Sequence, residues 1–152
     1  MTTVEVPKYE NDDQKNRAAC DIIAVMDRSG SMGGEKIDLV KKTLEFMIEQ
    51  VKEEDSVCVI TFDTHVSVDV PLAKMTKLYA GDSTNLSGGL FQALEVIKSR
   101  KTPNKVVSIL LFTDGLANVG VTKSSQIVES LENTLQQLGC ACSIFTFGFG
   151  KD

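Results

Sequence analysis

The chain has 152 residues, of which 42% are hydrophobic, and a formal net charge of -5. This length fits one domain, and the hydrophobic content is enough for a buried core. The 16 Lys and Arg are scattered along an acidic chain, which argues against nucleic acid as a partner because phosphate recognition needs a concentrated basic surface. No apolar run reaches the length of a membrane span, and the opening MTTVEVPKYENDDQ has no apolar signal-peptide core, so we expect no membrane insertion.

Residues 1–19 are polar and irregular, and they predict an N-terminal arm or linker before a domain at 20–152. The domain opens with a continuous apolar run at 22–26, which is typical of a strand buried on both faces of a parallel sheet. A helix is predicted next, from about Gly34 to Lys52. Its apolar face is made of Ile37, Val40, Leu44, Met47, Ile48 and Val51.

A second strand is predicted at Val57–Phe62, followed by a tight turn at 63–65. Residues 66–71 alternate between apolar and polar side chains and predict an antiparallel edge strand. A turn-rich loop at 81–85 then leads into another amphipathic helix. The apolar face of that helix is made of Leu86, Leu90, Ala93, Leu94 and Ile97.

Val106–Phe112 is a second fully apolar strand, and 142–147 is predicted as the last strand. Between them lies an amphipathic helix that Gly139 caps. Its apolar positions are Ile127, Leu131, Leu135 and Leu138. Strands that alternate with helices predict an α/β fold with a doubly wound, mostly parallel sheet and one antiparallel edge strand. Such sheets bind ligands outside the carboxyl ends of their strands.

Three separate segments place oxygen-bearing side chains at that edge of the predicted sheet. Asp27, Ser29 and Ser31 follow the first strand, and in an extended loop alternate side chains share a direction, so we expect them to converge. Thr84 precedes a helix, and Asp114 follows the central strand. Carboxylates and hydroxyls suit Mg²⁺ or Mn²⁺ and disfavour zinc or copper. The sequence therefore predicts a divalent-cation site at these five residues.

The five residues resemble the metal-ion-dependent adhesion site of the von Willebrand factor type A (vWA) domain. The family pattern D-x-S-x-S is met by Asp27, Ser29 and Ser31, and the family's threonine and aspartate match Thr84 and Asp114. The resemblance implies a Rossmann-like fold and direct ligation by the two serines and, in the ligand-bound state, by the threonine. It also implies that the two aspartates act on the metal directly or through water.

The resemblance extends over about residues 20–150. A full domain of this family continues to a sixth strand and a last helix, so we expect the fold to be truncated after the fifth strand. The apolar strand at 142–147 would then lie at a sheet edge, where it could template aggregation. We expect it to be covered by residues 1–19, by a second copy of the chain or by downstream sequence.

Two aspartates at most neutralise the ion, and hydroxyls add little charge, so the metal stays electrophilic. A carboxylate of a partner can then complete the coordination, and the positive end of the helix near Gly34 favours such an anion. The expected function is a divalent-metal-dependent protein–protein interaction module that binds an Asp or Glu of a partner. The alternatives are a scaffold domain of a larger protein, with a structural or vestigial metal site, and a metal-dependent phosphate-handling enzyme.

The enzyme alternative lacks the catalytic residues that it would need, so we expect that the chain is not an enzyme. Haloacid-dehalogenase-type phosphatases resemble D-x-D at this point, but position 29 is serine, and the acid that handles the proton is absent. The glycine-rich stretch at 30–36 does not satisfy the phosphate-binding pattern G-x-x-x-x-G-K-[ST]. His65, the single histidine, lies in a predicted turn and is expected to be solvated.

Each site residue also has a purely structural alternative when taken singly. Ser29 and Ser31 could cap the following helix, and Asp114 could belong to an ordinary turn. The helix after Thr84 needs a cap, for which Asn85 and Ser87 are the candidates.

The four cysteines match no zinc pattern and are expected to be free thiols, which suits a reducing compartment. They are Cys20, Cys58, Cys140 and Cys142. The sequences Asp-Arg-Ser-Gly-Ser-Met and, near the end of the chain, Thr-Phe-Gly-Phe-Gly look similar to those of intracellular eukaryotic vWA members, including members joined to ubiquitin-ligase modules. A cytoplasmic location is therefore expected, with an extracellular one left open for a fragment of a secreted protein.

Overall fold

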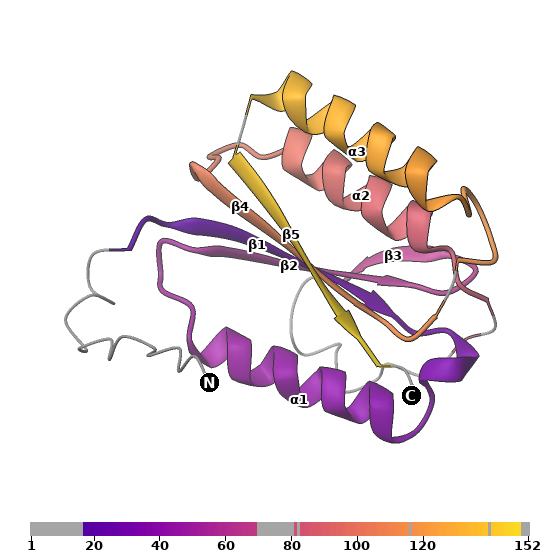
Figure 1. Ribbon diagram of the computed structural model, residues 1–152. Coiled ribbons are helices and arrows are strands. Elements are labelled where there is room, and N and C mark those ends of the chain that lie inside the picture. Colours follow the sequence, from indigo (N-terminus) through magenta and orange to yellow (C-terminus); the bar gives the residue numbers. More distant parts are fainter. Residues whose placement is uncertain (1–16, 70–80, 82, 116, 140, 150–152) are drawn as a thin grey trace, which may run out of the picture.

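The computed structural model describes residues 17–69, 81, 83–115, 117–139 and 141–149. In chain order the elements are β1 (Cys20–Asp27), the 3-10 helix η2 (Gly30–Met32), α1 (Glu35–Glu49), β2 (Ser56–Phe62), β3 (Val66–Asp69), α2 (Leu86–Lys98), β4 (Val106–Thr113), α3 (Ser124–Leu138) and β5 (Ala141–Gly148). Figure 1 shows three layers, with α1 on one face of the sheet and α2 and α3 on the other. None of the described helices is long and apolar enough to cross a bilayer.

The sheet has the strand order β3-β2-β1-β4-β5, and every neighbouring pair is parallel except β2 with β3. This confirms the predicted α/β class with its antiparallel edge strand. The helix that follows β1 packs on one face, and the helix that precedes β4 packs on the other (Figure 1). The strand order therefore reverses between β1 and β4, and a crevice outside the carboxyl ends of these strands is where such sheets bind ligands.

Apolar side chains fill both faces of the sheet. On one face, Ile37, Val40 and Leu44 of α1 are buried against β1 and β2, as their helical spacing predicted. On the other face, the predicted stripe of α2 meets α3 and the central strands in the larger core cluster. At the end of α3, Gly139 has φ 60° and forms the predicted left-handed cap.

The first helix ends at Glu49, three residues before the predicted boundary at Lys52. The cause is the side chain of Asp55, whose Oδ2 accepts the backbone N–H of Lys52 at 2.7 Å. The backbone N–H of Asp55 in turn donates to the Lys52 carbonyl at 3.1 Å. This local turn takes the backbone at Lys52 out of the helical hydrogen-bond pattern, and a spacing of apolar residues does not reveal it.

The carboxylate of Asp55 also anchors the segment that enters β1. It pairs with the guanidinium of Arg17 and accepts the backbone N–H of Cys20 at 2.9 Å. The hydrogen bonds from Arg17, together with those from the backbone N–H groups of Lys52 and Cys20, hold the pKa of Asp55 well below its usual range despite its burial.

We expect Asp55→Asn to lower the free energy of unfolding by about 1–3 kcal/mol at neutral pH, because Arg17 and the partly buried N–H groups of Lys52 and Cys20 lose a charged acceptor. A depressed pKa in the folded state stabilises the protein above the unfolded pKa of about 3.9, and this stabilisation is lost as pH falls through the folded pKa. Urea unfolding of both proteins should therefore show a constant difference between neutral and mildly acidic pH, and a smaller one once the pH lies below the unfolded pKa. A difference that grows on acidification would contradict this assignment.

The outermost described strand on one side of the sheet is β5, and most of it is exposed. Phe145 is 50% exposed, while Phe147 stacks on Phe112 of β4 with 4.9 Å between ring centroids. Beside these rings an apolar groove of about 750 Å³ runs between α1 and the face of β4 and β5 that α1 leaves open. Residues 1–16 lie outside the described residues. The domain boundaries, the truncation and the covering of β5 stay predictions.

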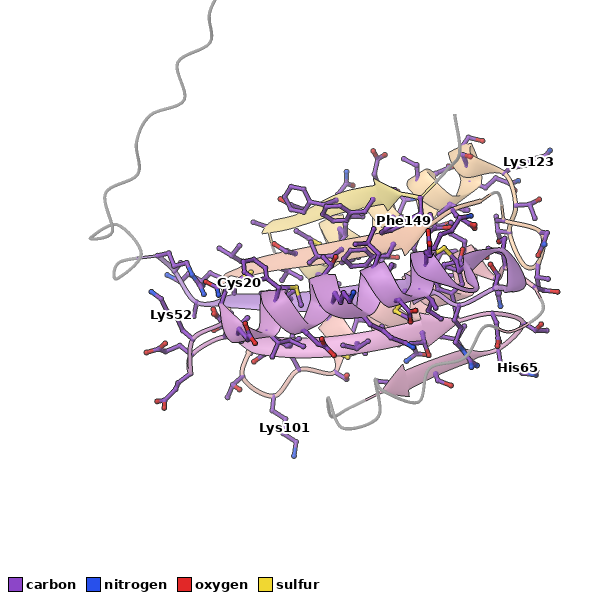
Figure 2. All side chains as sticks on the ribbon, turned by 90° about the horizontal axis from the view of Figure 1, so that it is seen from below. Cys20, Lys52, His65, Lys101, Lys123 and Phe149 are labelled. Carbon is purple, nitrogen blue, oxygen red and sulfur yellow. The ribbon has the colours of Figure 1, made fainter. Side chains whose placement is uncertain are left out.

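Two smaller predictions fall on described residues. The thiol of Cys20 is free, and Cys58 and Cys142 lie partly buried against the core, as their positions in apolar strands indicated. Figure 2 shows His65 at the same end of the molecule as Lys123, opposite Cys20 and Lys52. Its side chain is 87% exposed, which agrees with a solvated turn residue.

Candidate metal centre

Asp27 ends β1 at the edge where the strand order reverses, and it is fully buried. Its Oδ1 accepts the backbone N–H of Ser29 at 2.8 Å, and its Oδ2 accepts the hydroxyl of Thr113 at 2.7 Å. Thr113 is the last residue of the neighbouring strand β4. One donor from its own turn and one from β4 thus fix the carboxylate, and each oxygen keeps a further lone pair for a cation.

The turn after β1 brings Ser29 and Ser31 together, but the expected extended loop is wrong. Gly30–Met32 form a 3-10 turn, in which the N–H of Met32 donates to the carbonyl of Ser29 at 3.0 Å. The two serine hydroxyl oxygens lie 3.1 Å apart. The aspartate causes the difference: by capturing the N–H of Ser29, it starts a tight turn in place of an extended segment.

Asp114 follows β4 and reaches the same turn. Its Oδ1 accepts the hydroxyl of Ser31 at 2.8 Å, and its side chain is only 2% exposed. Its Oδ2 pairs with the ammonium of Lys36, which also donates to the carbonyl of Ser31 at 3.1 Å. A continuous chain of hydrogen bonds therefore joins Asp114, Ser31 and Ser29, and a cationic side chain already lies against it.

Thr84, 5% exposed, lies in the loop before α2. Its backbone N–H donates to Oδ1 of Asn118 at 2.8 Å, and its carbonyl accepts the N–H of Asn118 at 3.1 Å. Among the contacts between described residues, no hydrogen bond joins Thr84 to the other four predicted ligands. The structure thus connects the aspartates and serines directly, and it holds Thr84 from the loop that follows Asp114.

The structural alternatives for these residues find little support. Neither the 3-10 helix nor α1 has a side-chain cap, so Ser29 and Ser31 do not act as caps. Asn85 caps α2 by accepting the N–H of Gly88 at 3.0 Å, whereas the hydroxyl of Ser87 accepts a backbone N–H of a later loop. The capping role near Thr84 is therefore filled by its neighbour.

A further carboxylate at this end, Asp63, is directed to other partners. It pairs with Arg28 at 2.9 Å, accepts the N–H of His65 at 2.7 Å, and its carbonyl accepts the N–H of Asn85 at 2.8 Å. A Cβ on Gly81 would lie 2.2 Å from Oδ2 of Asp63, so glycine leaves room for this carboxylate. Arg28 is thus paired with Asp63, and Asp63 joins the end of β2 to the loop that holds Thr84.

The donor set fits a hard divalent cation. Carboxylates of Asp27 and Asp114 and hydroxyls of Ser29 and Ser31 supply only oxygen, which Mg²⁺ and Mn²⁺ accept and zinc does not prefer. Within the described part of the chain, no three His, Cys, Asp or Glu side chains gather, so a cation here depends on the hydroxyls.

Sequence reasoning missed three residues that shape this site. Thr113 orients Asp27, Asn118 holds Thr84, and Lys36 pairs with Asp114. The first two act through contacts between distant segments, which no local pattern shows. The third had a local signal, since Lys36 lies in the first turn of the helix that begins beside the serines.

The chain is similar in sequence to a small part of longer known proteins. Inter-alpha-trypsin inhibitor heavy chain H3 of Mus musculus is 30% identical over 149 residues, which cover 86% of this chain and 16% of that protein. E3 ubiquitin-protein ligase WAV3 of Arabidopsis thaliana is 28% identical over 127 residues, which cover 75% of this chain and 17% of that protein. The chain therefore spans about a sixth of the length of these curated relatives.

Solved structures and a family model agree with the topology. The von Willebrand factor type A structure from Catenulispora acidiphila superposes with a TM-score of 0.69 at 18% identity, covering 89% of this chain and 34% of that one. The PilB minor pilin from Streptococcus sanguinis superposes with a TM-score of 0.66 at 16% identity, covering 90% and 51%. A family model of the von Willebrand factor type A domain matches residues 22–117, which include all five predicted ligands. With more than half of its length matched, the chain belongs to the von Willebrand factor type A domain family.

Proposed function

We propose that this domain holds one Mg²⁺ or Mn²⁺ ion with Asp27, Ser29, Ser31, Thr84 and Asp114, and binds an Asp or Glu side chain of a partner protein there. The observation that carries the proposal is the hydrogen-bonded chain of Asp114, Ser31 and Ser29 beside the buried carboxylate of Asp27. A bound ion would supply an electrophilic centre with room for one more oxygen ligand.

Different residues of the chain would have different roles in such a site. Asp27 and Asp114 supply the negative charge that attracts the ion, while the serine hydroxyls supply neutral oxygens. Thr113 fixes the orientation of Asp27 through its hydroxyl. Asn118 fixes the backbone of Thr84, so a shift of its loop would move that threonine relative to the ion.

The relatives support a binding role without naming the partner. Two solved neighbours are a minor pilin and the type V pili tip protein Mfa5, and one curated relative is a ubiquitin-protein ligase. Because the chain spans a small fraction of such proteins, the activities in their names need not reside in this domain. We assign it recognition and not catalysis, since position 29 offers a hydroxyl where phosphatases of the D-x-D type carry an acid.

One observation favours a second candidate, a scaffold with a vestigial site. The ammonium of Lys36 pairs with Asp114 and offsets its charge. In that case partners would bind elsewhere on the domain, and their binding would not depend on metal.

Affinity capture from cell extract separates the two candidates. We expect partners to be retained with Mg²⁺ and released by EDTA, and to be lost by Asp114→Ala, because that variant removes one of the two charges that hold the ion. Asp38→Ala is the matched control, since Asp38 is a carboxylate on α1 with a 66% exposed side chain. A partner that the wild type retains in EDTA, and that Asp114→Ala also retains, would support the scaffold and contradict metal-dependent recognition.

A further inference from the structure

We propose that Lys36 is an affinity-setting residue of the metal site: its ammonium weakens metal binding and leaves the loaded site with one unit of positive charge for a partner carboxylate. This inference rests on the proposed function. It is carried by the contacts of the ammonium with Oδ2 of Asp114 and with the carbonyl of Ser31.

The backbone around Lys36 directs it to the site. Gly34, immediately before α1, has φ 77°, a positive value that glycine adopts without a steric cost. The helix then begins at Glu35, so Lys36 lies in its first turn next to the 3-10 turn that carries Ser31. The Lys36 side chain is only 30% exposed, although a lysine on the first turn of a surface helix could extend into solvent. The backbone at the start of α1 therefore places Lys36 beside Asp114.

The charges at the site can be counted from the contacts. Asp27 and Asp114 contribute two negative charges, and Lys36 contributes one positive charge. Asp63 and Arg28 form a separate pair and cancel each other. A divalent ion would therefore give a net charge of plus one with Lys36 present, and of zero without it. One carboxylate from a partner neutralises the first arrangement, but it would leave the second negatively charged.

Two effects of opposite sign follow from this count. Like charges repel, so Lys36 raises the free energy of the metal-bound state and lowers the affinity for the free ion. The same charge attracts an incoming carboxylate to the loaded site, because the interaction is charge-assisted. Lys36 thus weakens the binding of the ion alone and strengthens the binding of a partner carboxylate to the loaded site. The ion is therefore bound most tightly when a partner is present.

The test is calorimetric titration of the whole chain with Mg²⁺, comparing the wild type with Lys36→Met. We expect the variant to bind Mg²⁺ about tenfold more tightly, which is the size expected for one like charge in a partly exposed site. Lys36→Arg keeps the charge and should stay within about threefold of the wild type. Lys41→Met is the matched control, because Lys41 lies on the same helix and pairs with Asp38 at 3.6 Å, away from the serines.

A second titration uses acetate as the simplest carboxylate probe. With the site saturated by Mg²⁺, acetate should bind the wild type more tightly than Lys36→Met. Urea unfolding confirms that each variant is folded before titration.

The outcomes distinguish this inference from the proposed function. If the wild type binds Mg²⁺ and Lys36→Met binds it equally or more weakly, the inference is wrong while the metal site stands. If Lys36→Arg gains as much affinity as Lys36→Met, the charge is not the cause and the inference is also wrong. Binding by Lys36→Met but not by the wild type would support the charge effect of Lys36 and would contradict the proposed binding of the free ion by the wild type. If neither binds Mg²⁺ or Mn²⁺, the proposed function fails and the inference fails with it.

Discussion

Asp27→Asn is expected to abolish the stabilisation of the domain by Mg²⁺. The substitution preserves the shape of the fully buried Asp27 side chain but removes its charge, which is one of the two negative charges of the proposed site. The ion would then lose a carboxylate ligand whose orientation is fixed. A ligand at a hundredfold excess over its dissociation constant stabilises the folded state by about 2.7 kcal/mol, so saturating Mg²⁺ should raise the melting temperature of the wild type and leave that of the variant unchanged. Thermal unfolding with and without Mg²⁺ measures both.

The control for this experiment is the carboxylate at the other end of the same strand. Asp21 is 3% exposed, pairs with Arg100 and accepts the side-chain amide of Asn104 at 2.9 Å. Asp21→Asn should lower the melting temperature equally with and without Mg²⁺, so that the increment due to the ion survives. An increment that persists in Asp27→Asn would contradict the role of Asp27 in holding the ion.

A milder variant separates metal binding from folding. Ser29→Ala should weaken Mg²⁺ binding while changing the metal-free stability by less than about 1 kcal/mol, since no helix cap uses its hydroxyl. A larger loss of metal-free stability would show that the serine is mainly structural.

The second large effect concerns the packing of α2 on the sheet, where Gly89→Leu should lower the free energy of unfolding by about 3 kcal/mol. A Cβ at this position would lie 2.7 Å from Cδ1 of Phe62 and 3.1 Å from Cγ1 of Val25, two buried side chains that cannot both move aside. Urea unfolding measures the loss. Gly148→Leu is the matched control, because a Cβ there meets nothing within 4 Å. An equal loss in both variants would mean that the close approach of α2 is not what limits position 89.

The order of strands and helices could be predicted from the sequence because each element carries its own local signal. The apolar run in β1 and the three-to-four-residue spacing in α1 report burial directly. The end of α1 could not be predicted this way, because it is set by the side chain of Asp55. A helix end that is set by a hydrogen bond from the backbone to a side chain does not change the spacing of apolar residues in the sequence.

The candidate site could likewise be predicted only in part from the sequence. The edge of the sheet where Asp27, Ser29 and Asp114 meet could be inferred, since parallel strands end together and the residues follow those strands. The 3-10 turn could not, because it depends on the aspartate accepting the N–H of Ser29. The link between Thr84 and Asn118 joins loops 34 residues apart, and only the folded chain reveals it.

Diffraction from crystals grown with Mn²⁺, recorded at the manganese absorption edge, tests the metal site most directly. We predict one strong anomalous peak within ligand distance of the hydroxyl oxygens of Ser29 and Ser31 and adjacent to the carboxylates of Asp27 and Asp114, directly or through water. An acidic side chain of a neighbouring molecule on the same ion would add support for carboxylate recognition. The absence of a peak at these residues at saturating Mn²⁺, or a peak bound elsewhere, would contradict the proposed site.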